Sequence, residues 1–278
     1  MAKTLAFHAR NVGSTPIRPT NIKCKGRCRM TPIANMNVYN DGMRKSMLDK
    51  IWFLDKIDGD IDTVYDYGCA DGSLLKMVGE ICPSMKSFGY DISQEMIDIA
   101  KQNVPNADYL STYPKSNLHN TVLNASSVFH EIHAYSPDVK WDYQNIFNSG
   151  ATYIAIRDMF YSKHSCHPTN PISLAKVLQH ENPDKISEFE AFNGGLTSNK
   201  NFLHYLLTYR YVENWDREVR ENYFPHSIEE FLNKIPTKYE VVYFEHYTLP
   251  FLRDRVWQDF GFTLSDPTHA KILLKLVD

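Results

Sequence analysis

The seven-residue stretch Asp66-Tyr67-Gly68-Cys69-Ala70-Asp71-Gly72 decides the fold, because it joins a short strand to a helix through a tight glycine turn. Thr63 to Tyr67 are rich in β-branched and aromatic residues and predict the strand, and the apolar spacing of Ser73 to Cys82 predicts the helix. Gly68 and Gly72 let the backbone turn sharply and approach a ligand, and the free N–H groups at the start of the helix favour oxygen atoms. The stretch therefore predicts an α/β unit with a site for a nucleoside.

A second strand and helix follow in the order that such a unit needs. Ser87 to Asp91 predict a strand that ends in an acidic residue, 25 positions after Asp66. A carboxylate at this place is typical of a group that accepts hydrogen bonds from both hydroxyls of a ribose. Ser93 is a helix cap, and the spacing of apolar residues predicts a helix from Gln94 to Gln102.

These residues resemble the class I S-adenosylmethionine-dependent methyltransferases. The match covers Asp66 to Gly72, Gly89 to Asn103 and a fourth strand from Val122 to Val128. The resemblance implies that S-adenosylmethionine is the cofactor. The residues that it assigns to this cofactor are Asp66, Gly68, Cys69, Ala70 and Gly72 along the loop, Asp91 at the ribose, Ile92 and Met96 beside the adenine, and Ser127 at the end of the fourth strand. The pair Cys69-Ala70 departs from the more common glycine-containing pair of the family, but alanine is small enough for the turn.

The loop sequence has two other interpretations. An NAD-binding fold requires the spacing Gly-x-Gly-x-x-Gly, which this loop does not have. Asp71 would also repel a pyrophosphate, whereas a cofactor that carries a sulfonium and an ammonium would tolerate it. The other alternative is an α/β domain whose glycine turn binds nothing.

The remaining chain supplies the elements of a larger sheet. Further strands are expected at 107–111, 121–128, 151–157, 239–245 and 270–277, and further helices at 43–57, 141–147 and 228–235. We therefore expect an α/β fold with a seven-stranded, mostly parallel sheet between two helix layers and an antiparallel final pair. Ligands are expected at the carboxyl ends of the strands.

The chain divides into three regions. Residues 1–33 are expected to be a basic flexible arm, and residues 34–278 to be the methyltransferase domain. Residues 162–224 exceed the needs of a simple crossover and contain an aromatic helical pattern at 201–213. We interpret this insertion as a helical substrate lid, with a helix that only extends the core as the alternative.

Candidate catalytic residues lie after the fourth and fifth strands. Methyl transfer is an in-line displacement, so the enzyme aligns a nucleophile, excludes water and removes a proton where this is needed. His130 is the expected general base, and Glu131 is expected to orient it or to contact the substrate. Arg157 and Asp158 are expected to form either a buried ion pair or a polar substrate clamp. The polar clusters at 211–217, 221–223 and 266–269 are further candidates for the same cleft.

Charge is distributed unevenly along the chain and bears on the substrate. The net charge is −3, but residues 1–40 hold seven basic and no acidic residues, against 23 basic and 33 acidic residues in the rest. The basic arm and the aromatic residues of the insertion favour methyl transfer to RNA or another nucleotide-containing substrate, which is the substrate that we expect, whereas the acidic body favours a small metabolite as the alternative. The arm would also suit a solvated tail or an organelle transit peptide. A non-catalytic scaffold subunit that keeps the cofactor fold is the alternative of a different class.

Composition limits the compartment and the metal chemistry. No apolar run is long enough to span a membrane, and the start of the chain lacks the apolar stretch of a secretory signal. Five scattered cysteines do not indicate a disulfide framework, so we expect a cytoplasmic protein. Cys24 and Cys28 lie too far in the chain from His164, Cys166 and His167 to indicate a zinc site. We expect no metal.

Overall fold

A single mixed sheet is the centre of the computed structural model, which describes residues 46–110, 113 and 118–277. Its strand order is β3-β2-β1-β4-β5-β7-β6. The strands are β1 (Thr63–Tyr67), β2 (Lys86–Tyr90), β3 (Asp108–Leu110), β4 (Thr121–Ser126), β5 (Tyr153–Met159), β6 (Tyr239–Tyr247) and β7 (His269–Leu276). The first five strands pair in parallel, and β7 lies antiparallel between β5 and β6. The predicted seven-stranded, mostly parallel sheet is confirmed.

Helices cover both faces of this sheet because the strands bury residues on both sides. On β5, Tyr153 and Ala155 belong to one buried cluster, whereas Ile154 and Ile156 belong to another. This alternation is what the period of two along a strand produces. The helices of the first face are α2 (Met47–Lys50), η1 (Trp52–Asp55), α3 (Ser73–Ile81) and α4 (Gln94–Asn103), and those of the second are α5 (Phe129–Tyr135), α6 (Val139–Phe147) and α11 (Ile228–Leu232).

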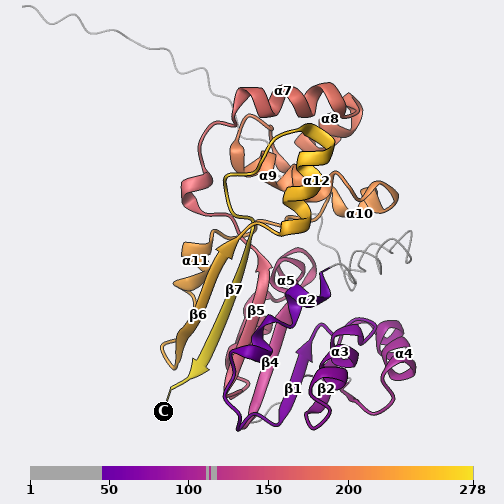
Figure 1. Ribbon diagram of the computed structural model, residues 1–278, viewed down its shortest axis with the longest axis vertical. Helices are drawn as coiled ribbons and strands as arrows, with labels where there is room; N and C mark the ends of the chain where they lie inside the picture. The colour runs from indigo at the N-terminus through magenta and orange to yellow at the C-terminus, as the bar shows by residue number, and fades with distance from the viewer. Residues whose placement is uncertain (1–45, 111–112, 114–117, 278) are drawn as a thin grey trace, which may run out of the picture.

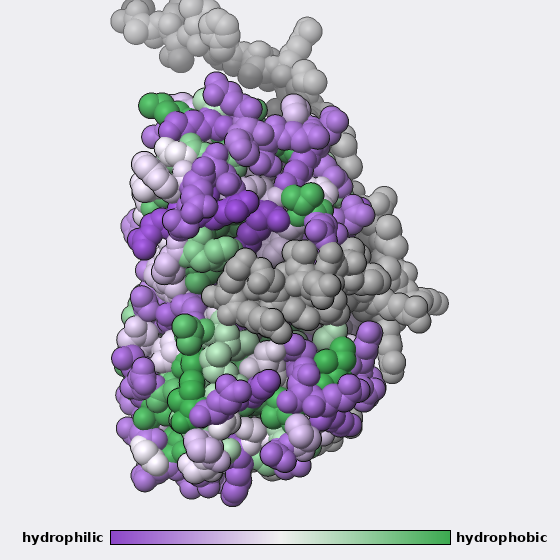
Figure 2. All heavy atoms as spheres, turned by 45° about the vertical axis from the view of Figure 1, so that its right-hand side comes forward, coloured by the Kyte–Doolittle hydropathy of each residue, from purple (hydrophilic) through white to green (hydrophobic). Residues whose placement is uncertain are grey.

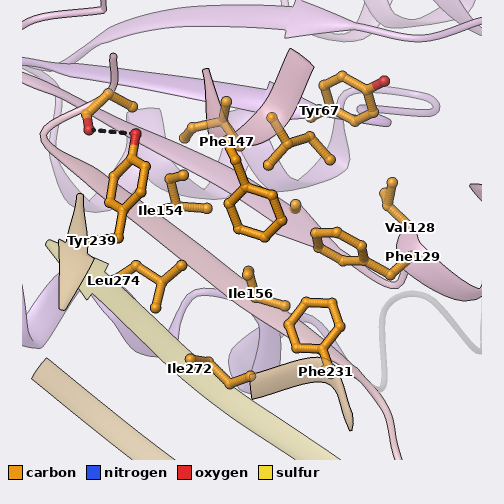
Figure 3. Packing of buried hydrophobic residues seen from close by; sticks show 14 of the residues in the cluster. Tyr67, Val128, Phe129, Phe147, Ile154, Ile156, Phe231, Tyr239, Ile272 and Leu274 are labelled. Carbon is orange, nitrogen blue, oxygen red and sulfur yellow. Dashed lines mark hydrogen bonds between the residues drawn. The ribbon is translucent and has the colours of Figure 1, made fainter. Parts of the chain in front are cut away.

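The core beneath α5 fixes the position of that helix. Figure 3 shows Phe129 of α5 and Phe231 of α11 packed over Ile156 of β5, with Ile272 of β7 beside them. The rings of Phe129 and Phe231 lie 5.0 Å apart at 78°. Edge-to-face packing of buried aromatic rings holds both helices against the sheet. The residues that follow Phe129 on α5 are thereby held at the carboxyl end of β4.

A separate helical layer lies above the carboxyl ends of the parallel strands (Figure 1). Its elements are η2 (Lys163–Ser165), α7 (Pro171–His180), α8 (Pro183–Asn193), α9 (Asn199–Thr208), η3 (Val212–Asn214), α10 (Trp215–Glu218) and α12 (Pro250–Phe260). Its core joins Phe189, Tyr205 and Leu206 of the insertion with Leu252 and Val256 of α12. The layer is therefore built from two segments that are far apart in the sequence.

Several predicted boundaries differ from the observed ones. The aromatic helix expected at 201–213 is α9, which ends at Thr208, and eight of its ten residues are buried. The helix expected at 43–57 is interrupted at Ile51 between α2 and η1. The fifth strand is shifted to Tyr153–Met159. The helix α5 was not predicted, and neither were α7, α8 and α12. The expected arm at 1–33, including Cys24 and Cys28, lies outside the described residues.

The visible surface differs between the two parts of the molecule. Figure 2 shows that hydrophilic residues predominate over the upper, helical part, whereas hydrophobic residues are more frequent over the lower part that contains the sheet. Among residues 46–110, 113 and 118–277, no helix combines the length and the apolar character that a membrane span requires.

Candidate active site

The loop between β1 and α3 has a backbone that only certain residues tolerate. Gly68, Ala70 and Gly72 have positive φ angles of 81°, 45° and 78°. A Cβ atom on Gly68 would lie 2.6 Å from Cγ2 of Val128, so the close approach of Val128, the residue before α5, requires glycine there. The N–H groups of Gly68 and Cys69 both donate to the carbonyl oxygen of Tyr90, at 2.7 and 2.9 Å. The loop is thus fixed against the end of β2.

Asp91 joins this loop to the start of α4. Its Oδ2 accepts a hydrogen bond from the N–H of Ala70 at 2.9 Å, and its Oδ1 accepts one from the N–H of Ser93 at 2.8 Å. Burial raises the pKa of Asp91, and these two hydrogen bonds oppose the shift. Ser93 caps α4, as predicted, by accepting a hydrogen bond from the N–H of Met96 at 3.3 Å. The carboxylate is held in one orientation before any ligand arrives.

A cavity of about 540 Å³ opens beside the loop and extends beneath the helical layer. The predicted site residues that line it are Gly68, Ala70, Asp91, Ile92, Met96, Ser127, His130, Glu131 and Arg157. The sheet, the loop and α5 bring these residues together from four regions of the sequence. A volume of this size is in the range of small-molecule sites.

Four predicted site residues do not line this cavity. Asp66 lies beneath the loop, where its Oδ1 accepts a hydrogen bond from Nδ2 of Asn124 at 2.7 Å and burial raises its pKa to about 7. Cys69 is buried, and burial raises the pKa of its thiol. Both residues line a smaller cavity of about 20 Å³. Gly72 faces Tyr109 instead, and Asp158 lies behind His130.

His130 and Asp158 form a buried pair. Nδ1 of His130 lies 2.8 Å from Oδ1 of Asp158, and because a carboxylate only accepts, Nδ1 carries the proton. Burial lowers the pKa of His130, but the charge and the hydrogen bond of Asp158 outweigh this effect and raise it to about 9. The other oxygen of Asp158 accepts from the N–H of Phe129 at 2.7 Å. Asp158 therefore orients the imidazole and the first turn of α5 together.

Arg157 is directed to the opposite face of the sheet. Its Nε donates to Oδ2 of Asp49 at 2.9 Å, and its Nη1 donates to the hydroxyl of Ser127 at 2.9 Å. The ion pair between Arg157 and Asp158 that was considered from the sequence does not form, because neighbouring residues of a strand point to opposite faces. Arg157 instead fixes Ser127, whose φ of 59° is unusual for a residue other than glycine.

The insertion contributes charged residues to the same cavity. Nη2 of Arg217 donates to Oε1 of Glu131 at 3.1 Å, and its Nε donates to Oε1 of Glu221 at 2.8 Å. Glu218 and Tyr223 also line the cavity, and the hydroxyl of Tyr223 donates to Glu218. The sequence indicated the regions 211–217 and 221–223 only as candidates and did not single out Glu218.

Two other candidate regions from the sequence, which contain His269 and Trp215, lie differently relative to the cavity. His269 of the cluster at 266–269 lines the cavity. Trp215 does not line it, because its indole N–H donates to Glu188 at 2.7 Å and its ring lies under Nζ of Lys185. Lys50, Arg210 and Phe251 line the cavity without having been predicted, since nothing in their local sequence indicates a site.

Comparison with known proteins shows the fold. No family model and no curated protein matches the sequence. Among solved structures, a chain of the complex between the Haloferax volcanii Trm112 methyltransferase activator and a methyltransferase is similar, with a TM-score of 0.50 and 12% identity over 87% of this chain and 95% of that chain. The plantazolicin methyltransferase BpumL in complex with SAH has a TM-score of 0.49 and 13% identity over 86% and 89%. The chain has the class I methyltransferase fold.

Proposed function

We propose that the chain is a methyltransferase that uses S-adenosylmethionine. The observation that carries this proposal is the position of Asp91, whose carboxylate is fixed at the cavity by Ala70 and Ser93. A carboxylate at the end of the second strand of such a fold is suited to bind the two hydroxyls of a ribose. No residue of the loop supplies a charge that would hold a pyrophosphate instead.

The residues around the cavity fit the cofactor that we propose. Two of the three residues other than glycine with positive φ in the described part of the chain, Ala70 and Ser127, line this cavity. Backbone conformations of this kind are often kept at ligand sites. Ile92, which is 76% exposed, and Met96 offer an apolar surface for a planar base. When bound, the cofactor supplies a methyl group on a sulfonium, which is electrophilic.

We assign the catalytic roles to the pair formed by His130 and Asp158. The lone pair of the acceptor forms the new bond to carbon while the bond from this carbon to sulfur breaks and its electrons stay on sulfur. His130 is the proposed base for the proton of the acceptor, and Asp158 is a positioning residue that holds Nδ1. Arg157 positions Ser127 and has no direct role in this assignment.

The expected RNA or nucleotide-containing substrate remains a prediction. The arm at 1–33 that favoured it lies outside the described residues. Trp215 and Tyr223 are aromatic residues of the insertion that could stack on a base, but the ring of Trp215 lies under Lys185, and Tyr223 is buried with the ring of His130 at 5.5 Å. The charges that line the described cavity favour a different kind of acceptor.

Calorimetric titration of S-adenosylmethionine and S-adenosylhomocysteine tests the proposed function. We expect micromolar binding that Asp91→Ala weakens by about 10-fold to 100-fold, because hydrogen bonds to a charged group are lost. Asp98→Ala on the exposed side of α4 is the matched control and should bind normally. A folded protein that binds neither compound contradicts the proposal. Binding without methyl transfer to any acceptor would favour the scaffold alternative.

A further inference from the structure

The side of the cavity nearest the insertion is rich in carboxylates. Glu131, Glu218 and Glu221 all line it, together with the guanidinium of Arg217. Arg217 is shared between Glu131 and Glu221, and the hydroxyl of Tyr135 also donates to Glu221, at 2.6 Å. We call Glu131, Arg217, Glu218 and Glu221 the acidic end of the cavity.

The other basic residues that line the described cavity include Lys50, His130, Arg157 and Arg210, and Glu131 is among the acidic residues that act on Lys50. Arg157 is paired with Asp49. The guanidinium of Arg210 lies between two aromatic rings, 4.6 Å from that of Tyr211 and 4.4 Å from that of Phe251. The imidazolium of His130 is balanced by Asp158. Among the described residues, the three carboxylates of the acidic end therefore outnumber Arg217, the cation that bridges two of them.

The behaviour of the carboxylates agrees with this excess of negative charge. Burial raises the pKa of Glu218 to about 7, and the neighbouring Glu221 adds to the shift. Burial and Glu221 also raise the pKa of Glu131, against the opposing effects of His130 and Arg217. Crowded carboxylates become harder to ionise when too little positive charge surrounds them. A cation placed among them would relieve this repulsion.

The geometry leaves room for such a cation beside the proposed base. His130, Glu131 and Glu221 each offer one ligand atom, and these atoms lie within 4.8 Å of one another. The side chain of Glu131 is 33% exposed, so a ligand in the cavity can reach it. Because Nδ1 of His130 is hydrogen-bonded to Asp158, Nε2 is the ring nitrogen that a ligand in the cavity would contact.

We propose that the acidic end binds a protonated amine and that this amine is the methyl acceptor. The inference rests on the proposed function and names the substrate class of the same site. Glu131 and Glu221 accept hydrogen bonds from the ammonium, and its positive charge favours the neutral form of His130. The imidazole then takes one N–H proton, and the freed lone pair of the nitrogen attacks the methyl carbon as the bond from carbon to sulfur breaks. The products are a methylated amine and S-adenosylhomocysteine.

A divalent metal ion and a nucleotide suit the acidic end less well. Arg217 already donates to both carboxylates that would hold a metal, and it repels a doubly charged ion about twice as strongly as an ammonium. The phosphate of a nucleotide placed at this end would face the three carboxylates of the acidic end. An ammonium carries a single positive charge and needs only hydrogen-bond acceptors around it.

Binding of amines to the complex with S-adenosylhomocysteine tests the inference. The probes are butylamine, spermidine and a lysine-containing hexapeptide, each with its N-acetylated counterpart, titrated in the presence of excess EDTA. A short RNA is titrated in parallel. We expect at least one amine to bind about 10-fold or more tightly than its acetylated form, and the same amine to be methylated by labelled S-adenosylmethionine.

Variants connect this binding to the acidic end. Glu131→Gln keeps the shape of a partly exposed side chain and should weaken amine binding about 10-fold, with unchanged affinity for S-adenosylhomocysteine. Glu240→Gln on the exposed side of β6 is the matched control and should bind the amine normally. The inference is overturned if a complex that binds S-adenosylhomocysteine binds none of the amines, binds acetylated probes equally, methylates RNA instead, or requires Mn²⁺ for binding. Failure to bind S-adenosylhomocysteine would contradict the proposed function instead.

Discussion

The substitution Asp158→Asn separates the electrostatic role of Asp158 from its packing. Asparagine has nearly the same shape, and its side-chain oxygen can keep one of the hydrogen bonds that the carboxylate accepts from the N–H groups of Phe129 and Met159, both at 2.7 Å. The negative charge that raises the pKa of His130 is lost. Burial then lowers that pKa below its ordinary value of 6.5.

The size of the effect follows from the pKa of about 9 in the folded protein, against 6.5 in the unfolded chain. A raised pKa means that the folded state binds the proton more tightly, so the stabilisation is complete below pH 6.5 and is lost as the pH rises to about 9. At about 1.4 kcal/mol per pH unit, the loss is on the order of 3 kcal/mol. Asp158→Asn lacks the negative charge that raises the pKa of His130, so it should lack this pH dependence of the free energy of unfolding.

Urea denaturation at a series of pH values measures the effect. Because Lys50, Asp66 and Glu218 also have shifted pKa values in this range, the wild-type protein is compared with the variant. The difference between the free energies of unfolding of the wild-type protein and Asp158→Asn should shrink by about 3 kcal/mol between about pH 6 and pH 9.5. NMR titration of the imidazole gives the pKa directly. If His130 is the base, kcat/KM for methyl transfer should rise to a plateau above about pH 9 in the wild-type protein.

The reasoning would be refuted by either of two results. One is an equal pH dependence of stability in the wild-type protein and in Asp158→Asn. The other is a measured pKa of His130 at or below its ordinary value in the wild-type protein. His119→Gln, which removes a histidine outside the cavity, is the matched control.

Two further predictions concern the loop between β1 and α3. Gly68→Ala should lower the free energy of unfolding by more than about 1 kcal/mol and abolish binding of S-adenosylhomocysteine, since the new Cβ meets Val128 and φ is positive. Gly79→Ala is the control, because Gly79 lies in the interior of α3 with open space around it, and it should raise the free energy of unfolding by about 1 kcal/mol. Equal urea midpoints for the two variants would contradict both expectations. Cys69 should resist alkylation by iodoacetamide in the folded protein because it is buried and its thiol has a raised pKa, whereas the exposed Cys166 should react, as peptide mass mapping would reveal.

The first half of the sheet could be predicted because its signals are local. The observed β1 has the predicted bounds, α3 is one residue shorter at its end, and β2 begins and ends one residue early. The cap at Ser93 acts through a hydrogen bond three residues along the chain. A β-branched run, a capping serine and glycines at positive φ determine structure within a few residues, so one sequence is sufficient to find them.

The helix α5 could not be predicted in the same way. The residue before it is Val128, whose side chain cannot cap a helix. The hydrogen bond acceptor for the N–H of Phe129 is Asp158, which comes from β5. Because the cap is supplied by a distant strand, no local signal was present. The contacts of Arg217 with Glu131 also join segments that the sequence does not relate.

Other missed helices did have local signals. Asn170 caps α7 and Asn182 caps α8, and each is followed by a proline at the first helical position. The helix α12 also begins with a proline and ends before Gly261, which has a φ of 64°. These signals are sufficient to predict α7, α8 and α12, and with them the helical layer, from the sequence.

The place of β7 in the sheet has a consequence for the order in which a nascent chain can fold. Although β7 follows β6 in the sequence, it lies between β5 and β6, and β6 pairs with no other strand of the described sheet. Until the ribosome has added residues 269–276, the edge of β5 that pairs with β7 is exposed, and β6 has no strand to pair with. The elements up to β5 can pack as they are made, but the C-terminal part must wait. We therefore expect a chain arrested before His269 to expose an unpaired strand edge and to need protection by a chaperone.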